Sequence, residues 1–173
     1  MSAITEEKEQ QVNAENLEEN EGQVSRKQFV VFQIGSEEYG VIISQAKGII
    51  KPKKITNVPN TAEHVLGVIN LRGQIVPVVD LKKKFHIAYD KSKNTEDQRI
   101  ITVEVNDTLI GIFVDGVNEV VWLEEDTIEP APEVAGGIKQ EYLLGIGKIE
   151  DRLLVLVDLR KLLFDDTGEE DNT

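Results

Sequence analysis

The chain has 173 residues, a formal net charge of −13 and no cysteine. The lack of cysteine excludes structural disulfides and thiolate metal sites, and nothing indicates an oxidising compartment. We recognise neither a signal peptide nor a run of the ~20 apolar residues that a membrane span needs, so we expect a cytoplasmic protein without direct membrane insertion.

Acidic residues concentrate at both ends of the chain. Residues 1–24 hold seven acidic residues and one basic residue (−6), and residues 165–173 hold five acidic residues and no basic one (−5). These segments supply −11 of the net charge, so the middle of the chain is nearly neutral. Because segments with few apolar groups cannot offset the entropy lost on folding, we predict disordered acidic tails over 1–24 and 165–173. The folded region is then 25–164.

The middle of the chain repeats itself. Phe29–Ile50 matches Ile100–Val121 at a shift of 71 residues, and Leu66–Phe85 matches Leu144–Leu163 at a shift of 78. This pattern indicates a duplicated unit of about seventy residues. We predict a first barrel over about 27–85 and a second over about 99–164, with the chain termini free to exchange between them.

Within each unit, short β-branched runs alternate with turn residues, which is typical of antiparallel hairpins. Several runs, such as Phe29–Ile34 and Leu153–Val157, are apolar on both faces. No long amphipathic helix is present to cover a parallel sheet, so we predict an all-β fold of two small closed barrels with covered outer faces. The expected hairpin tips are Gly35-Ser36, Arg72-Gly73, Asn106-Asp107 and Glu150-Asp151.

Three local features complete the predicted fold. Asp80 and Asp158 each precede a short stretch rich in Leu, Lys and Arg, and each should cap a brief helix that ends its unit. Pro77 has no backbone donor, so its strand should be an edge or carry a bulge at that point. Residues 86–98 and 124–141 read as exposed, mobile connections.

We find no pattern typical of catalysis or of cofactor binding. His64 and His86 lie in separate contexts without a metal-ligand motif, and no serine lies in a nucleophile elbow. The segment GIGKIED (Gly145–Asp151) lacks the third glycine of a dinucleotide motif and the ending of a P-loop. The sequence therefore predicts no enzyme, no metal and no cofactor, and favours a protein that docks other proteins.

Clustered lysines leave a second function open. Small barrels with basic loops bind nucleic acids, and such loops are present here. Aromatic residues, which stack on bases, make up only 5% of the chain, and the acidic tails would oppose a polyanion. We therefore expect no nucleic acid partner and keep a nucleic-acid-binding barrel as the alternative. The lysines are Lys51, Lys53 and Lys54 in one loop and Lys82, Lys83, Lys84, Lys91 and Lys93 around another.

Four segments carry a family resemblance in chain order: QFVVFQIGSEEYGV, GVINLRGQIVPVVDL, GIFVDGVNEVV and IEPAPE. From about Lys27 to Phe164 the chain resembles the CheW family of bacterial chemotaxis adaptors, with Asn70-Leu71-Arg72-Gly73 and Pro77 as the most specific element. The resemblance implies two five-stranded SH3-like barrels packed together and a non-catalytic, stand-alone scaffold that is a monomer when isolated. Its partners would be the regulatory domain of the histidine kinase CheA and the cytoplasmic tip of methyl-accepting chemoreceptors, in two-component signalling arrays at the membrane.

The resemblance also implies two docking surfaces. The first barrel would bind CheA through apolar side chains, and the groove between the barrels would bind the receptor tip. The positions that correspond to kinase docking are Val30, Ile43, Ala46 and Ile49. Those that correspond to receptor docking are Gly67, Arg72, Ile100 and Val120.

The chain departs from the family pattern in the first unit. Ala46 stands where valine is common, Gly48 where glutamate is common, and Ile42 where aspartate is common. The glutamate would pair with the arginine of the hairpin tip, so Arg72 should lack a carboxylate within its barrel and be available to another protein. Ala46 would lose about 1–2 kcal/mol of apolar contact if its site is buried in a complex. The second unit keeps Val117 and Glu119 at the equivalent positions.

Overall fold

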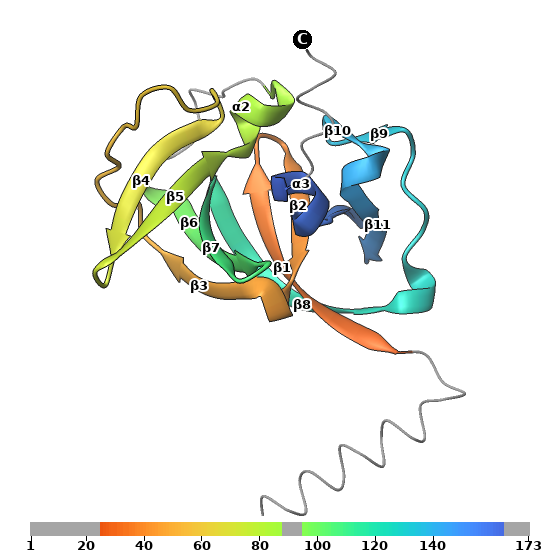
Figure 1. The fold of residues 1–173 in the computed structure, drawn as a ribbon. Helices are drawn as coiled ribbons and strands as arrows, with labels where there is room; N and C mark the ends of the chain where they lie inside the picture. The colour runs from red at the N-terminus through yellow and green to blue at the C-terminus, as the bar shows by residue number, and fades with distance from the viewer. Residues whose placement is uncertain (1–24, 88–94, 165–173) are drawn as a thin grey trace, which may run out of the picture.

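A computed structural model describes residues 25–87 and 95–164, which form two five-stranded sheets (Figure 1). The predicted acidic tails lie outside the described residues. Sheet A has the strand order β11 (Leu143–Ile149), β12 (Arg152–Val157), β2 (Glu37–Ile42), β1 (Arg26–Ile34), β8 (Gly116–Glu124). Sheet B has the order β3 (Ala46–Ile50), β6 (Arg99–Val105), β7 (Thr108–Val114), β5 (Gln74–Asp80), β4 (Val65–Leu71). The prediction of an all-β fold is confirmed.

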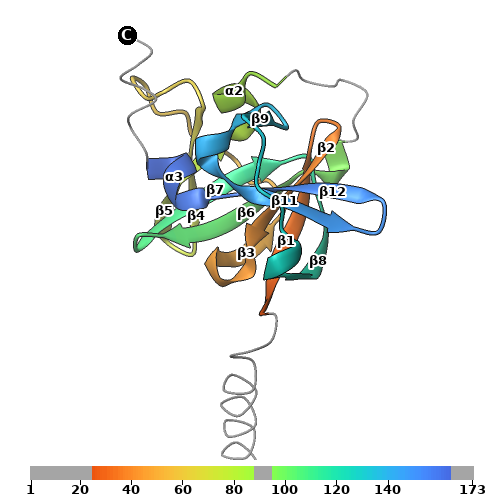
Figure 2. The same ribbon diagram turned by 90° about the vertical axis from the view of Figure 1, so that its right-hand side faces the viewer.

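The two repeats exchange strands reciprocally. Sheet A combines β1 and β2 of the first repeat with β8, β11 and β12 of the second, and sheet B combines β6 and β7 of the second with β3, β4 and β5 of the first. The junctions are the parallel pairs β12–β2, where Val155 faces Tyr39, and β5–β7, where Val78 faces Gly111. Figure 2 shows the β11–β12 hairpin beside β1 and β2. Each sheet is therefore incomplete without both repeats.

The four predicted hairpin tips are confirmed. A turn joins each strand pair at these residues. Each tip holds at least one residue in the left-handed region, with φ values of 62° at Gly35, 54° at Arg72, 52° at Asn106 and 54° at Glu150. Tight two-residue connections between antiparallel strands require such values.

One short helix follows the last strand of each repeat, as predicted. The two helices are α2 (Leu81–Phe85) and α3 (Leu159–Phe164). The Asp80 side chain accepts a hydrogen bond from the backbone N of Lys82 at 2.9 Å, and that of Asp158 accepts one from Lys161 at 3.3 Å. A carboxylate at this position satisfies donors that a first helical turn leaves unpaired.

Pro77 lies in β5, which is an internal strand of sheet B. The parallel register between β5 and β7 covers only Val78, Val79 and Asp80. Pro77 precedes this paired stretch. On the other side Pro77 faces Val68 of β4. The prediction of an edge strand or a bulge at Pro77 is wrong, because β5 lies between β7 and β4 and the nearby register shift is in β4, between Val65 and Gly67.

Residues 124–141 contain more structure than a simple connection. They carry η4 (Glu125–Thr127), the short hairpin β9 (Val134–Ala135) and β10 (Ile138–Lys139), and the start of η5 (Gln140–Tyr142). The Tyr39 hydroxyl donates to the carbonyl oxygen of Gly136 at 2.6 Å, and Ile138 is fully buried. Burial, with a smaller contribution from the nearby Glu37 charge, raises the pKa of Tyr39 to about 12. Part of this segment therefore packs against sheet A.

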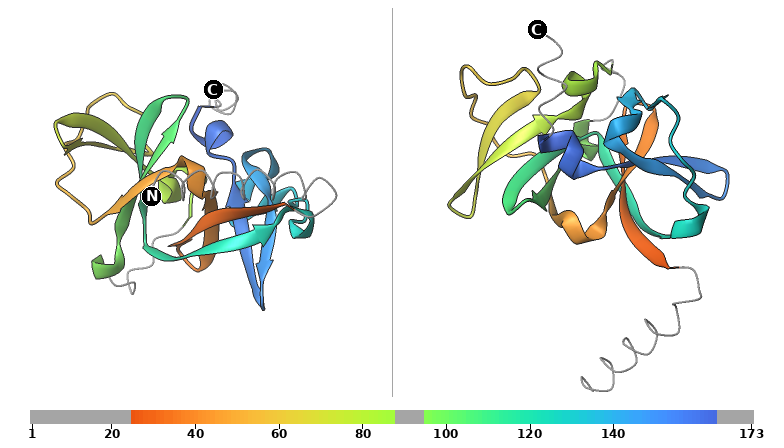
Figure 3. Two further views of the ribbon diagram at one scale, coloured as in Figure 1. Left: turned by 90° about the horizontal axis from the view of Figure 1, so that it is seen from below. Right: turned by 45° about the vertical axis from the view of Figure 1, so that its right-hand side comes forward.

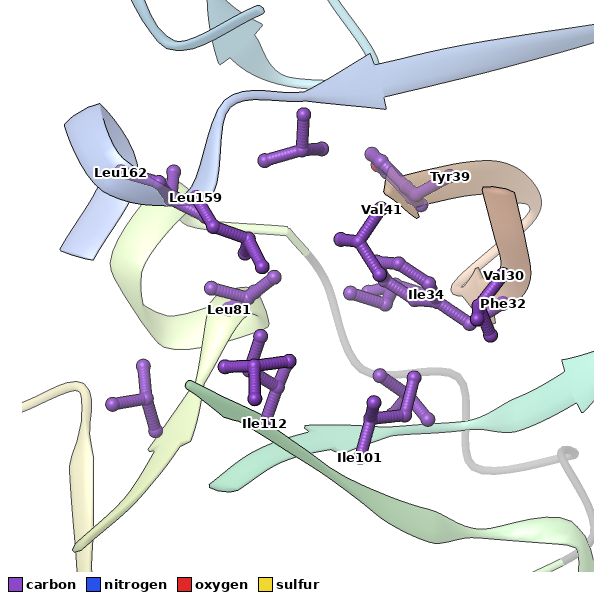
Figure 4. Close-up of a cluster of buried hydrophobic side chains, with 14 of the residues drawn as sticks. Val30, Phe32, Ile34, Tyr39, Val41, Leu81, Ile101, Ile112, Leu159 and Leu162 are labelled. Carbon is purple, nitrogen blue, oxygen red and sulfur yellow. The ribbon is translucent and has the colours of Figure 1, made fainter. Parts of the chain in front are cut away.

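The core consists of three clusters. The largest lies where the sheets meet and includes Phe32, Leu81 and Ile101 (Figure 4). A second lies within sheet A and a third within sheet B. Strand β1 supplies Phe32 to the first cluster and Phe29 to the second, so its two faces are both buried, as the sequence predicted. Each large side chain buried in this way contributes roughly 1.5–3 kcal/mol.

A buried ion pair connects the two sheets. Lys82 Nζ of α2 lies 2.5 Å from Asp115 Oδ1, between β7 and β8, and both side chains are at most 8% exposed. The other carboxylate oxygen of Asp115 accepts a hydrogen bond from the backbone N of Gly35 at 2.7 Å. Gly35 lies at the tip of β1–β2, so the pair ties the helix after sheet B to a hairpin of sheet A.

Candidate docking surfaces

Strand β3 forms one edge of sheet B and strand β8 one edge of sheet A, the opposite edges being β4 and β11. The two sheets lie side by side in Figure 3. Ile49 on β3 and Val120 on β8 are each 46% exposed. These residues are equivalent under the 71-residue shift. The duplicated fold therefore presents one exposed aliphatic side chain at the same place on each outer strand.

Ile43 and Ala46 lie on the approach to β3. Ile43 begins η2 (Ile43–Gln45), and the backbone N of Ala46 donates to its carbonyl oxygen. Both side chains are half-buried and pack against the cluster between the sheets. They can offer a partner only the part of their surface that the core leaves uncovered.

Val30 and Ile100 lie in the core, with 2% and 0% of their surface exposed. Val30 faces Val120 across β1–β8, and Ile100 faces Ile50 across β6–β3. Neither side chain reaches the surface of this structure. Each is the register partner of a residue on an outer strand, so a role of either in docking would be indirect.

Gly67 occupies a position that no other residue fits. Its φ is +145°, and an added Cβ would lie 2.2 Å from the carbonyl oxygen of Thr56. Gly145 repeats this arrangement, with φ +149° and the carbonyl oxygen of Glu129 at 2.6 Å. Both glycines lie at a β-bulge where an extra segment bridges the sheet edge. Gly67 therefore has a structural role, which its repeat partner shares.

Arg72 is exposed at the tip of β4–β5, where the backbone N of Gly73 donates to the Asn70 side chain at 2.8 Å. Among the residues that the structure describes, none forms an ion pair with Arg72. Sheet A does contain a paired arginine. There Glu119, which corresponds to Gly48 of the first repeat, lies 2.5 Å from Arg152.

Arg152 holds two carboxylates in sheet A. Its NH2 group donates to Glu119, and its Nε lies 3.2 Å from Glu38 without a well-directed hydrogen bond. The hydrogen bond to Glu119 is the main cause that raises the pKa of Arg152 above its ordinary value. Glu38 also accepts from Asn118. This network links β2, β8 and β12 on the surface of sheet A.

Sequence reasoning missed several exposed apolar side chains. Ile75 is 63% exposed and Leu153 59% exposed, and they are equivalent under the 78-residue shift. Each follows a hairpin tip, so comparison of the repeats could have identified them. Trp122, the single tryptophan, is 56% exposed on β8, with the Arg26 guanidinium 5.2 Å from its ring centroid. Its outward position in an alternating strand was the available signal.

The described residues contain no group of three or more His, Asp or Glu side chains arranged for a metal ion. A polar cavity of about 440 Å³ opens beside the buried Asp115. The Arg99 guanidinium in its wall donates to the backbone oxygens of Glu96 and Gln98. No helix in the described part of the chain is long and apolar enough to cross a membrane.

Comparisons with known proteins agree on one family. The CheW-like domain model matches residues 28–166. The chain is 39% identical to the chemotaxis protein CheW of Klebsiella aerogenes, over 82% of this chain and 84% of that protein, and 37% identical to CheW of Helicobacter pylori, over 79% and 81%. A crystal structure of the scaffolding protein TtCheW from Thermoanaerobacter tengcongensis superposes with a TM-score of 0.73 and 40% identity, covering 80% of this chain and 88% of that one. The chain belongs to the CheW-like domain family.

Proposed function

We propose that this protein is a non-catalytic chemotaxis adaptor that couples the histidine kinase CheA to methyl-accepting chemoreceptors in cytoplasmic signalling arrays. The observation that carries the proposal is the pair of equivalent edge strands, β3 and β8, each with an aliphatic side chain 46% exposed. Family membership over residues 28–166 and the scaffolding relative support it. Linking two modest interfaces on one rigid body raises the effective concentration of one partner near the other.

The kinase surface would lie along η2 and β3. Ile49 would be its anchor because it is the most exposed of the four predicted kinase-docking residues, while Ile43 and Ala46 would form the rim. Val30 would act from the core. An apolar surface on the regulatory domain of CheA would cover Ile49 and remove it from water.

The receptor surface would include Arg72 and Val120. Arg72 has no internal ion pair among described residues, so a carboxylate near the cytoplasmic tip of a receptor could take that place. Val120 would add an apolar contact. Gly67 and Ile100 would hold the neighbouring backbone in shape.

Calorimetry tests the kinase contact directly. We expect the purified chain to bind the CheA regulatory domain of the same organism, and Ile49→Asp to weaken binding at least about tenfold, the effect of losing ~1.4 kcal/mol. Leu144→Asp is the matched control, because Leu144 is 48% exposed but lies on β11. Absence of binding at high micromolar concentration would refute the proposal.

The receptor contact is tested by charge reversal. Arg72→Glu should abolish receptor-dependent kinase control while the chain stays folded, because a hairpin tip contributes little to the core. Glu150→Arg, at the equivalent tip of β11–β12, should leave that control intact. Equal loss in both variants would show that the tips act through the fold.

A nucleic-acid-binding barrel is the alternative, favoured by exposed lysines on one side of sheet B. It predicts a salt-dependent mobility shift with single-stranded DNA or RNA. No shift at low salt would remove it.

A further inference from the structure

Equivalent segments of the two repeats, residues 46–79 and residues 117–157, carry opposite net charge. Residues 46–79, which contain β3, β4 and β5, hold five basic residues and one acidic residue (+4). The equivalent residues 117–157 hold three basic and nine acidic residues (−6). The contrast extends to single positions, since Lys53 and Lys54 correspond to Glu124 and Glu125 at a shift of 71.

The basic residues of the first segment form what we call the basic strip. It consists of Lys47, Lys51, Lys53, Lys54 and Arg72, all of them exposed. Lys53 Nζ donates to the carbonyl oxygen of Asn70 at 2.6 Å, two residues before Arg72. This contact joins the lysines that follow β3 to the β4–β5 tip. Two exposed aliphatic residues, Ile49 and Ile75, lie on the same elements.

The basic strip has no carboxylate partner among the described residues. The exposed ion pairs found among the described residues lie on or beside sheet A instead, for example Lys27 with Glu125 and Lys148 with Glu129. Gly48 stands where the second repeat has the paired Glu119. Lys27, Lys148 and Arg152 are therefore paired within the fold, whereas the cations of the basic strip are left for another acidic group.

We propose that residues 1–24 of this same chain dock on the basic strip and cover Arg72. That segment carries a net charge of −6. It leaves the fold at Ser25, whose carbonyl oxygen accepts a hydrogen bond from the backbone N of Glu125 at 2.8 Å. At this point the three acidic residues Glu124–Asp126 lie near two basic ones, Arg26 and Lys27, of which Lys27 pairs with Glu125. The basic strip, in a segment with a net charge of +4, is therefore the more favourable place for an acidic segment.

The chain length permits this contact. Twenty-four residues reach at most roughly 80 Å when extended and about 27 Å as a coil. A folded region of this size has a radius of gyration of only about 14 Å. Because the segment is covalently attached, its effective concentration at the strip is on the order of millimolar, so a weak electrostatic contact is populated. A docked segment would compete with any acidic partner for Arg72, but the contact itself does not depend on the proposed adaptor function.

Paramagnetic relaxation tests the contact in the full chain. The protein has no cysteine, so Val12→Cys takes a nitroxide at one known position. We expect loss of backbone amide intensity in Lys47–Lys54 and in Leu71–Gln74. The intensity should recover in 1 M salt, where the screening length falls to ~3 Å from ~10 Å at 0.1 M.

A pair of charge-matched variants makes the test specific. Lys51→Glu with Lys54→Glu should abolish the intensity loss, whereas Lys139→Glu with Arg160→Glu, the same charge change away from the strip, should preserve it. Both pairs are exposed and form no ion pair with another described residue, so both variants should fold, which their amide spectra check directly.

Three results would overturn the proposal. The first is a loss of amide intensity that is confined to residues near Ser25, or one that persists unchanged in the variant Lys51→Glu with Lys54→Glu. The second is equal loss in isotope-labelled chains mixed with separate nitroxide-bearing chains, which would identify a second copy as the occupant. The third is an unaffected strip whose amides shift on addition of a single-stranded oligonucleotide, which would identify a nucleic acid.

Discussion

The two sheets have the same strand order and differ in what their surfaces carry. Sheet A holds Arg152 between Glu38 and Glu119, whereas the equivalent positions in and beside sheet B are Gln74, Leu109 and Gly48. The bulge glycines Gly67 and Gly145, in contrast, are retained in both. Exposed ion pairs contribute only about 0–1 kcal/mol, so surfaces can diverge while backbone geometry cannot. The comparison separates what the duplicated fold requires from what each surface is free to become.

The largest effect should come from breaking the contact that joins the two sheets. Lys82→Met leaves the buried Asp115 carboxylate without its cation, and we expect it to lower the free energy of unfolding by about 3–5 kcal/mol. Lys82→Met combined with Asp115→Asn should recover a good part of that loss, because no charge is then buried alone. Urea denaturation measures both. A single variant as stable as the parent would show that water reaches the pair.

The bulge glycines should come next. Gly67→Ala places a Cβ against the Thr56 carbonyl oxygen at a positive φ, so we expect a loss of more than about 2 kcal/mol. Gly145→Ala should lose nearly as much, because it meets the same obstacle in sheet A. Gly73→Ala is the control, since its φ is also positive but its Cβ would meet nothing within 4 Å. Similar denaturation midpoints for Gly67→Ala and Gly73→Ala would contradict the packing argument.

A smaller difference concerns Tyr39 in sheet A, which corresponds to Ile110 in sheet B. The pKa of Tyr39 is raised from 10.0 to about 12 by folding, so its contribution to stability is complete below pH 10 and is lost as the pH rises through 12. The parent should therefore lose stability in this range more steeply than Tyr39→Phe. Thermal unfolding at pH 9 and pH 11 compares the two slopes, and parallel slopes would mean that Tyr39 does not titrate with the unfolding transition.

The smallest expected effect is the transfer of an ion pair from sheet A to sheet B. Gly48→Glu with Gln74→Arg recreates the pair of Glu119 and Arg152, and we expect a gain of at most about 1 kcal/mol. The Cβ of residue 48 would lie 3.1 Å from the Thr102 hydroxyl, so part of the gain is used to move that side chain. Salt titration of the urea midpoint should reveal the new pair, because screening would erase the gain. A midpoint unaffected by salt would show that no pair forms.

Local chemistry made the hairpin tips and the helix caps predictable, because Gly73 adopts the positive φ of a turn and Asp80 supplies a side-chain acceptor for a helix cap. The assignment of strands to sheets was not predictable in the same way, since two similar repeats offer each strand two similar neighbours. Strands buried on both faces also hide which side is outward, which is why alternation could not show that Val30 and Ile100 lie inside. The pair of Lys82 and Asp115 joins residues 33 positions apart with no local pattern.

The reciprocal exchange of strands has a consequence for synthesis on the ribosome. Strands β1 and β2 are made first, but their sheet is completed only when β12, which ends at Val157, has been made. At ~5–20 residues per second, the roughly 115 residues between them take on the order of 10 s. Until β8 (Gly116–Glu124) has also been made, Phe29–Ile34, apolar on both faces, has no partner strand beyond its own hairpin. The nascent chain is thus most vulnerable to aggregation at its beginning, and a chaperone that holds this first hairpin would protect the whole protein.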